Sequence, residues 1–277
     1  MVHERIELEL NYDEITESGG HHASISTYVI ENSPEMDENR QRPAVLICPG
    51  GGYGFKSSRE REPIAIAMNG FGFQAFTLDY SVAPSKFPTA LIELATAVAL
   101  IRKNAKQWHV NPDQIIVCGF SAGGHLAASL GVYWHQEWLH QRCGLSADEI
   151  RPNGLLLSYP VIVANEFTHE GSMTNLFGAK NEVSWEQGAL EKQVSQQVPP
   201  VFIWHTYEDG AVPVENALQF VDALRKHKVS TEVHIFKSGG HGLSLANEET
   251  RWMNSGEIQK ECQIWIHLSA AWLKSLF

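Results

Sequence analysis

The sequence predicts an α/β fold, with a twisted, mostly parallel β-sheet and helices on both of its faces. Three observations predict this class. Short apolar runs rich in valine and isoleucine alternate with longer segments at helical spacing, which indicates βαβ crossovers. Most of these runs are continuously apolar, as in parallel strands covered on both faces. The length of 277 residues suits one large domain, so we expect residues 1–277 to form a single domain.

Eight segments of the chain are predicted strands. Residues 6–10 and 25–30 alternate apolar and polar side chains, and no helix separates them. We therefore expect the two to pair antiparallel at one edge of the sheet. The six later strands are expected at residues 44–48, 73–78, 115–118, 154–159, 200–205 and 232–236. Helices are expected at residues 60–69, 89–108, 122–134, 214–226 and 258–276.

Residues 163–198 break this alternation. The segment is polar, has weak periodicity and is too long for an ordinary connection between a strand and a helix. Insertions of this kind often form lids or binding loops, so we expect a small lid-like insertion. The alternative is a surface excursion with no catalytic role. Its polar residues include Asn165, Glu166, His169, Glu170, Asn175, Lys180 and Asn181.

The composition excludes several classes of partner. The formal net charge is −11, which argues against nucleic acid and against an anionic membrane surface. The first residues are charged and do not resemble a signal peptide. No apolar run approaches the length of a membrane span. The four cysteines are far apart and form no CxxC pair, which favours reduced thiols in a cytoplasmic protein. The oligomeric state is not indicated.

A candidate nucleophile lies between a predicted strand and a predicted helix. Residues 119–123 read GFSAG and match G-x-S-x-G in the strand–turn–helix context that makes this motif specific. Glycines flank the serine because larger side chains would clash in so tight a turn. The turn would project the Ser121 hydroxyl from the carboxyl end of the sheet. The N–H groups of the following helix would lie near a developing oxyanion.

A glycine run, Pro49-Gly50-Gly51-Gly52-Tyr53, directly follows the predicted strand at 44–48. Glycines in such a loop let backbone N–H groups turn toward a substrate oxygen. The alternative is a loop that binds phosphate. That alternative is disfavoured, because no Lys-Ser/Thr follows the glycines and no G-x-G-x-x-G pattern is present.

Several stretches together resemble the α/β-hydrolase fold family, and within it the small bacterial esterase/lipase, acetylesterase-like branch. They are CPGGGYGF, LDYSVAPSKFPTAL, GFSAGGHLAA, HTYEDGAVPVEN and GGHG, in the order that the family requires. The resemblance implies an oxyanion hole formed by the N–H groups of Gly51, Gly52 and Ala122. Two positions depart from the family pattern: Pro49 replaces a histidine, and Ser81 replaces an arginine.

The general base has two candidates. His125 lies one helical turn after the serine, in a helix expected to pack on the sheet, where a neutral ring bonded to a neighbouring loop is expected. His241 lies in SGGHG after the last predicted strand, and the family order of serine, acid, histidine favours it. The acid would follow the strand at 200–205. Asp209 matches the family's Asp-x-x-Val-Pro, and its alternatives are Glu208 and Glu215.

The sequence therefore predicts a serine carboxylester hydrolase with the triad Ser121, Asp209 and His241 and an acyl-enzyme intermediate. The expected substrates are small, soluble, short-acyl esters, acetylated carbohydrates among them, with Tyr53, Phe55 and Tyr207 in contact with the substrate. No metal or cofactor is expected. The alternatives are a peptidase of the prolyl-oligopeptidase type, which usually carries an additional large domain, and a non-catalytic binding protein that kept the hydrolase fold.

Overall fold

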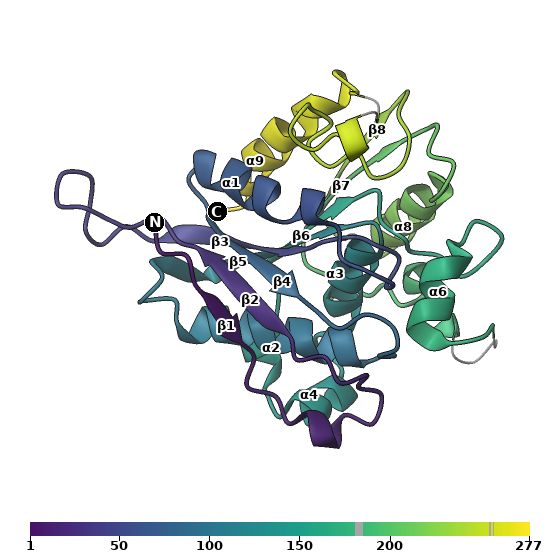
Figure 1. Cartoon of the computed structure of the whole chain (residues 1–277), viewed down its shortest axis with the longest axis horizontal. Helices are drawn as coiled ribbons and strands as arrows, with labels where there is room; N and C mark the ends of the chain where they lie inside the picture. Colours follow the sequence, from purple (N-terminus) through teal and green to yellow (C-terminus); the bar gives the residue numbers. More distant parts are fainter. Residues whose placement is uncertain (181–184, 255, 257) are drawn as a thin grey trace.

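The computed structural model describes residues 1–180, 185–254, 256 and 258–277. Within them an eight-stranded sheet runs in the order β1-β2-β4-β3-β5-β6-β7-β8 (Figure 1). The strands are β1 (Arg5–Glu7), β2 (Ser24–Tyr28), β3 (Arg42–Cys48), β4 (Gln74–Asp79), β5 (Val110–Phe120), β6 (Gly154–Ser158), β7 (Val201–Thr206) and β8 (Thr231–Phe236). From β4 to β8 every pairing is parallel, whereas β1 with β2 and β2 with β4 are antiparallel. The predicted fold class and antiparallel edge are confirmed.

The helices cover both faces of this sheet (Figure 1). They are α1 (Glu62–Gly70), α2 (Thr89–Lys103), α3 (Ala122–Tyr133), α4 (Glu137–Cys143), α5 (Ala147–Ile150), α6 (Glu170–Phe177), α8 (Glu215–Lys226) and α9 (Trp265–Ser275). One apolar layer packs against α2, α3 and α8, and the other against α1 and α9. In β3, Leu46 faces the first layer while Val45 and Ile47 face the second, as the two-residue period of a strand requires.

Several boundaries differ from the sequence prediction, and the helix expected at 258–276 begins at Trp265. The helix expected at 89–108 ends at Lys103, where the Asn104 side chain donates to the carbonyl of Leu100. The strand expected at 6–10 is limited to β1, and β5 begins earlier than expected because Val110 pairs with Arg42 of β3. The short helices α4 and α5 were not predicted, because they are too short and polar to produce a clear apolar period.

The part of the 163–198 insertion that the structure describes is anchored to its neighbours. Met173 and Leu176 on α6 are buried. The Asn175 side chain donates to the carbonyl of Gly52 at 2.9 Å, and Lys86 donates to the carbonyl of Asn175 at 2.8 Å. The insertion therefore contacts the glycine loop directly. Its motion as a lid stays a prediction, and residues 181–184, Asn181 among them, lie outside the described residues.

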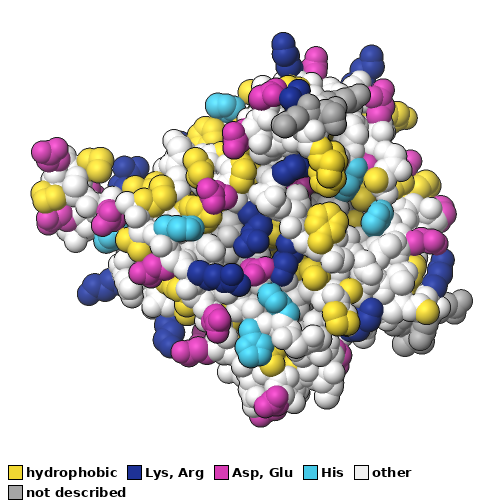
Figure 2. All heavy atoms as spheres, viewed as in Figure 1, with side chains coloured by type: hydrophobic (Ala, Val, Ile, Leu, Met, Phe, Trp, Pro, Cys, Tyr) yellow, Lys and Arg dark blue, Asp and Glu magenta, His cyan; other side chains and the backbone are white. Residues whose placement is uncertain are grey.

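The surface carries both signs of charge. On the face drawn in Figure 2, acidic and basic side chains are interspersed. In the described part of the chain, no helix combines the length and the apolar character that a membrane crossing needs.

Candidate active site

Ser121 occupies the tight turn between β5 and α3. Its φ is 54° and its ψ is −119°, a conformation that non-glycine residues rarely adopt and that costs roughly 1–3 kcal/mol. The backbone holds it there: the N–H of Ser121 donates to Ser158 at 3.0 Å, and its carbonyl accepts from Val161 at 3.1 Å. A Cβ on Gly119 or Gly123 would lie 2.2 Å from a backbone oxygen. This crowding is the physical reason for the glycines on both sides of the serine.

Three side chains far apart in the sequence meet beside this turn. His241 Nε2 lies 2.7 Å from Ser121 Oγ, and His241 Nδ1 lies 2.7 Å from Asp209 Oδ2. Asp209 follows β7 and His241 follows β8, so both come from the carboxyl ends of parallel strands, as Ser121 does. This is the geometry in which a carboxylate orients an imidazole toward a hydroxyl.

Asp209 is held in one orientation by four groups. Its Oδ1 accepts the N–H groups of Ala211 and Val212 at 3.0 and 2.9 Å, and His205 Nε2 lies 3.4 Å from Oδ2, beside His241. Burial opposes the ionised form, but the hydrogen bonds from His205 and His241 outweigh it and hold the pKa of Asp209 well below its usual value. The Asp209 carboxylate is therefore ionised and can balance the positive charge of a protonated His241.

The alternative acids lie elsewhere. Glu208 is exposed to solvent beside Asp209, and Glu215 is the first residue of α8. In the described structure neither forms a hydrogen bond with His241, whereas Asp209 does. The geometry therefore favours Asp209 among the three carboxylates considered.

His125, the other candidate base, is buried in α3. Tyr53 donates its hydroxyl to Nδ1 at 2.9 Å, and Nε2 donates to the carbonyl of Gly188 at 3.1 Å. Burial lowers the pKa of His125 to about 4, so its ring is neutral at physiological pH. The interpretation of a neutral histidine bonded to a neighbouring loop is confirmed.

The glycine loop after β3 is rigidly held. Its first N–H, that of Gly50, donates to Glu60 Oε2 at 2.8 Å, and the carbonyl of Pro49 accepts the Tyr80 hydroxyl at 2.6 Å. Gly51 has φ 130° and Gly52 has φ 62°, and a Cβ on Gly51 would meet the carbonyl oxygen of Phe55 at 2.2 Å. The contact with Tyr80 fixes the loop at the position where the related family carries a histidine.

Three backbone donors remain available near the serine. Among the described residues, the N–H groups of Gly51, Gly52 and Ala122 donate to no protein group. Gly51 and Gly52 line a cavity of about 430 Å³ together with Ser121 and His241. Unpaired donors beside a nucleophile suit a negatively charged oxygen.

A family model described as BD-FAE matches residues 32–224. The chain belongs to the BD-FAE family, an α/β-hydrolase family of esterases. The resemblance to the α/β-hydrolase esterases is thereby confirmed.

Two curated proteins are similar in sequence to this BD-FAE chain. An endo-1,4-beta-xylanase B of Butyrivibrio fibrisolvens is 38% identical over 81% of this chain and 36% of its own length. An acetylxylan esterase of Xylanibacter ruminicola is 29% identical over 76% of this chain and 43% of its own length. The chain thus spans less than half the length of these two relatives.

Solved structures match the whole fold. An acetyl ester-xyloside bifunctional hydrolase from Caldicellulosiruptor lactoaceticus is 34% identical, with 99% of this chain and 96% of that chain covered at a TM-score of 0.83. A carboxylesterase from Lactobacillus plantarum is 29% identical, with 99% and 98% covered, also at 0.83. The BD-FAE chain therefore shares its complete architecture with known esterases.

The predicted substrate contacts need correction. Phe55 lines the cavity, and its contact with a substrate stays a prediction. Tyr53 does not line it, because its side chain is 2% exposed and its hydroxyl is bonded to His125. Tyr207 is 68% exposed and lies outside the cavity lining, because it faces solvent after β7. Proximity in the sequence predicted these two positions without indicating which way the side chains point.

Other residues that line the cavity were not assigned to the site from the sequence. They include Arg59, Glu60, His169, Asn175 and Trp252. Arg59 lies over the Trp252 ring, with 5.1 Å between the guanidinium carbon and the ring centroid. His169 and Asn175 were noted only as polar residues of the insertion. Trp252 follows no periodic pattern, so no sequence signal identified it.

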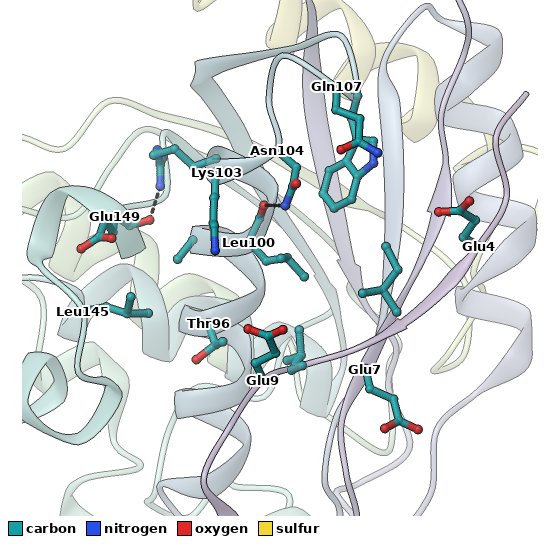
Figure 3. Close-up of a pocket in the computed structure, with 15 residues that line it drawn as sticks. Glu4, Glu7, Glu9, Thr96, Leu100, Lys103, Asn104, Gln107, Leu145 and Glu149 are labelled. Atoms are coloured by element: carbon teal, nitrogen blue, oxygen red, sulfur yellow. Dashed lines mark hydrogen bonds between the residues drawn. The ribbon is translucent and has the colours of Figure 1, made fainter.

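A larger cavity, about 730 Å³, lies between β1 and α2 (Figure 3). Its walls carry Glu4, Glu7, Glu9, Lys103 and Glu149 around an apolar floor. No serine, cysteine or histidine lines it, so it offers no nucleophile for an esterase. Within the described ranges, no group of three or more histidine, cysteine or acidic side chains is arranged to hold a metal ion.

Proposed function

We propose that this BD-FAE family member is a carboxylester hydrolase for small, soluble, short-acyl esters, acetylated carbohydrates among them, and that Ser121, His241 and Asp209 carry the reaction. The observation that carries the proposal is the hydrogen-bonded series from Ser121 Oγ through His241 to Asp209, with 2.7 Å at each step, beside an open cavity. An ionised Asp209 can stabilise the imidazolium that forms when His241 accepts a proton.

The reaction follows from these positions. Ser121 Oγ attacks the ester carbonyl carbon while His241 Nε2 takes the hydroxyl proton, and the carbonyl oxygen becomes an oxyanion that accepts hydrogen bonds from Gly51, Gly52 and Ala122. His241 then gives its proton to the leaving alcohol, and an acyl-enzyme remains. Water, deprotonated by the same imidazole, attacks the acyl carbon. The bond from that carbon to Ser121 Oγ then breaks, His241 returns the proton to Oγ, and the acid is released.

The size and polarity of the cavity support a small substrate. A volume of about 430 Å³ is at the small end of the range for ligand pockets. Arg59, His169 and Asn175 add polar groups to its wall, which suits an alcohol rich in hydroxyl groups. The names of the relatives, an acetylxylan esterase and an acetyl ester-xyloside bifunctional hydrolase, support acetylated sugars as substrates.

Two measurements test this proposal. A fluorophosphonate probe should label the protein once, and Ser121→Ala should abolish the labelling, while Ser275→Ala at the exposed end of α9 leaves it unchanged. A panel of esters from acetyl to octanoyl should give the highest kcat/KM at acetyl to butyryl, falling roughly tenfold for each methylene that the cavity cannot accept. Full labelling of Ser121→Ala, or kcat/KM that rises through octanoyl, would contradict the proposal.

The two alternatives predict different results in the same assays. A peptidase of the prolyl-oligopeptidase type would cleave peptides faster than acetyl esters. A non-catalytic protein would hydrolyse neither peptides nor esters, even with the three side chains in the same arrangement. The ester panel therefore needs one prolyl peptide substrate beside the acetyl esters.

A further inference from the structure

His169 stands at the start of α6, and its half-buried side chain forms part of the cavity wall. The ring lies over two glycines that leave room for it: its Cε1 would be 3.7 Å from a Cβ on Gly52 and 3.4 Å from one on Gly171. His169 therefore lies against the glycine loop that faces the ester carbonyl in the proposed reaction.

The hydrogen bonds at one edge of the ring fix its protonation. The backbone N–H of Ser172 donates to His169 Nδ1 at 3.2 Å, so Nδ1 is an acceptor and carries no proton. The Ser172 hydroxyl lies 2.8 Å from the same nitrogen. Because a neutral imidazole carries one proton, that proton is on Nε2.

The other edge of the ring has a free donor. Nε2 accepts no bond and donates none to any described residue, and it belongs to a residue of the cavity wall. Burial, together with the charge that His241 carries when protonated, lowers the pKa of His169. The ring thus stays neutral, with its single N–H on Nε2.

The chemistry of an acetyl ester limits what this N–H can meet. The acetyl group has one carbonyl oxygen, and in the proposed reaction that oxygen is taken by the glycine loop and Ala122. A methyl group accepts no hydrogen bond. The bridging oxygen of the ester receives its proton from His241 in the same reaction. The remaining acceptors of a carbohydrate ester are the hydroxyl, glycosidic and ring oxygens of its alcohol part.

We propose that His169 determines specificity for the alcohol part of the ester, by donating its Nε2–H to a sugar oxygen. This inference rests on the proposed function, and it assigns a substrate-binding role to a residue of the 163–198 insertion. A substrate whose alcohol part has no such oxygen would gain nothing from the interaction.

Two variants separate this role from the role of His169 in starting α6. His169→Asn keeps an acceptor for the Ser172 N–H, because asparagine is among the best N-cap residues, but its side chain is too short to replace the Nε2–H. His169→Gln supplies an amide N–H near the Nε2 position, but its side chain has no acceptor placed for the Ser172 N–H. The substrates are a methyl xyloside with one acetyl group and phenyl acetate.

We expect His169→Asn to lower kcat/KM about tenfold on the sugar acetate, the effect of one neutral hydrogen bond, and to leave phenyl acetate within about threefold of wild type. His169→Gln should retain the sugar activity and unfold at a lower temperature than His169→Asn. An unchanged sugar activity in His169→Asn overturns the inference, and so does an equal loss on both substrates, which would indicate a role in the common chemical step.

The wild-type enzyme provides the control for the proposed function itself. If the enzyme hydrolyses phenyl acetate but not the sugar acetate, the proposal that it acts on carbohydrate esters is overturned. The role proposed for His169 is then overturned as well. Hydrolysis of neither ester overturns the proposed esterase activity. Hydrolysis of both esters, with selective loss of sugar activity in His169→Asn, supports both proposals.

Discussion

Two carboxylates are buried in different regions of the molecule, and their surroundings shift their pKa values in opposite directions. Asp209, 5% exposed, lies at the carboxyl edge of the sheet after β7. Glu93, 0% exposed, lies on α2 beneath the antiparallel edge. Burial raises the pKa of Glu93 to about 7, whereas the pKa of Asp209 is held well below its usual value.

The number of hydrogen bonds does not explain this difference. Glu93 accepts the N–H and the hydroxyl of Ser81 and the hydroxyl of Tyr12. Asp209 also accepts several bonds, from two backbone N–H groups and from His241, with His205 nearby. The partners differ in kind: those of Glu93 are neutral, while an imidazole beside Asp209 can become positively charged.

The comparison teaches that a buried carboxylate keeps a low pKa when its partner can carry the opposite charge. A charge-assisted hydrogen bond is roughly twice as strong as a neutral one, and it offsets the desolvation that dominates at Glu93. Variants of His241, Asp209 and Glu93 test this contrast.

Removing the imidazole beside Asp209 should cost the most. We expect His241→Ala to lower kcat on phenyl acetate by up to roughly 10⁶-fold, as loss of a triad histidine does in a well-studied hydrolase. His125→Ala should instead lower the free energy of unfolding by about 3 kcal/mol through lost packing and hydrogen bonds. The assignment is wrong if His241→Ala is active while His125→Ala is folded and inactive.

Neutralising the carboxylate tests the charge itself. Asp209→Asn keeps the size of the side chain but removes its negative charge, so kcat should fall roughly 10⁴-fold with little change in KM. Glu208→Gln changes the exposed neighbour and should be mild. A severe loss in Glu208→Gln with an active Asp209→Asn would transfer the role of the acid to Glu208.

Much of the fold and the turn at Ser121 could be read from local patterns in the sequence, whereas the choice of Asp209 and His241 rested on the resemblance to the α/β-hydrolase family. Continuous apolar runs predict parallel strands, and GFSAG between a strand and a helix allows little but a tight turn at Ser121. Asp209 and His241 follow strands whose carboxyl ends meet at one sheet edge. Their catalytic roles stay predictions until the variants are measured.

The cavity wall could not be read in the same way. Whether Tyr53 faces the substrate depends on a contact with His125, 72 residues away. His169 and Trp252 reach the cavity from segments without periodicity. Side-chain direction in irregular segments is set by tertiary packing, which leaves no pattern along the chain.

The smallest effect is expected at the other carboxylate, and it concerns stability. A pKa of about 7 in the folded state, against 4.5 for an ordinary glutamate, means that the folded protein holds this proton more tightly than the unfolded chain does. The resulting stabilisation is complete below about pH 4.5 and is lost as the pH rises through about 7. Glu93→Gln cannot ionise, so it should gain stability relative to wild type as the pH rises.

Urea unfolding of both proteins measures this gain. Between about pH 5 and about pH 8.5, the free energy of unfolding of Glu93→Gln should rise relative to wild type by up to about 3 kcal/mol, with activity at the triad retained. Glu137→Gln, at an exposed position on α4, controls for the loss of one charge. A difference between Glu93→Gln and wild type that stays constant with pH would mean that Glu93 is ionised throughout. Hydrogen bonds from neutral partners would then suffice to keep a buried carboxylate charged, and the ionised state of Asp209 would not require an imidazole partner.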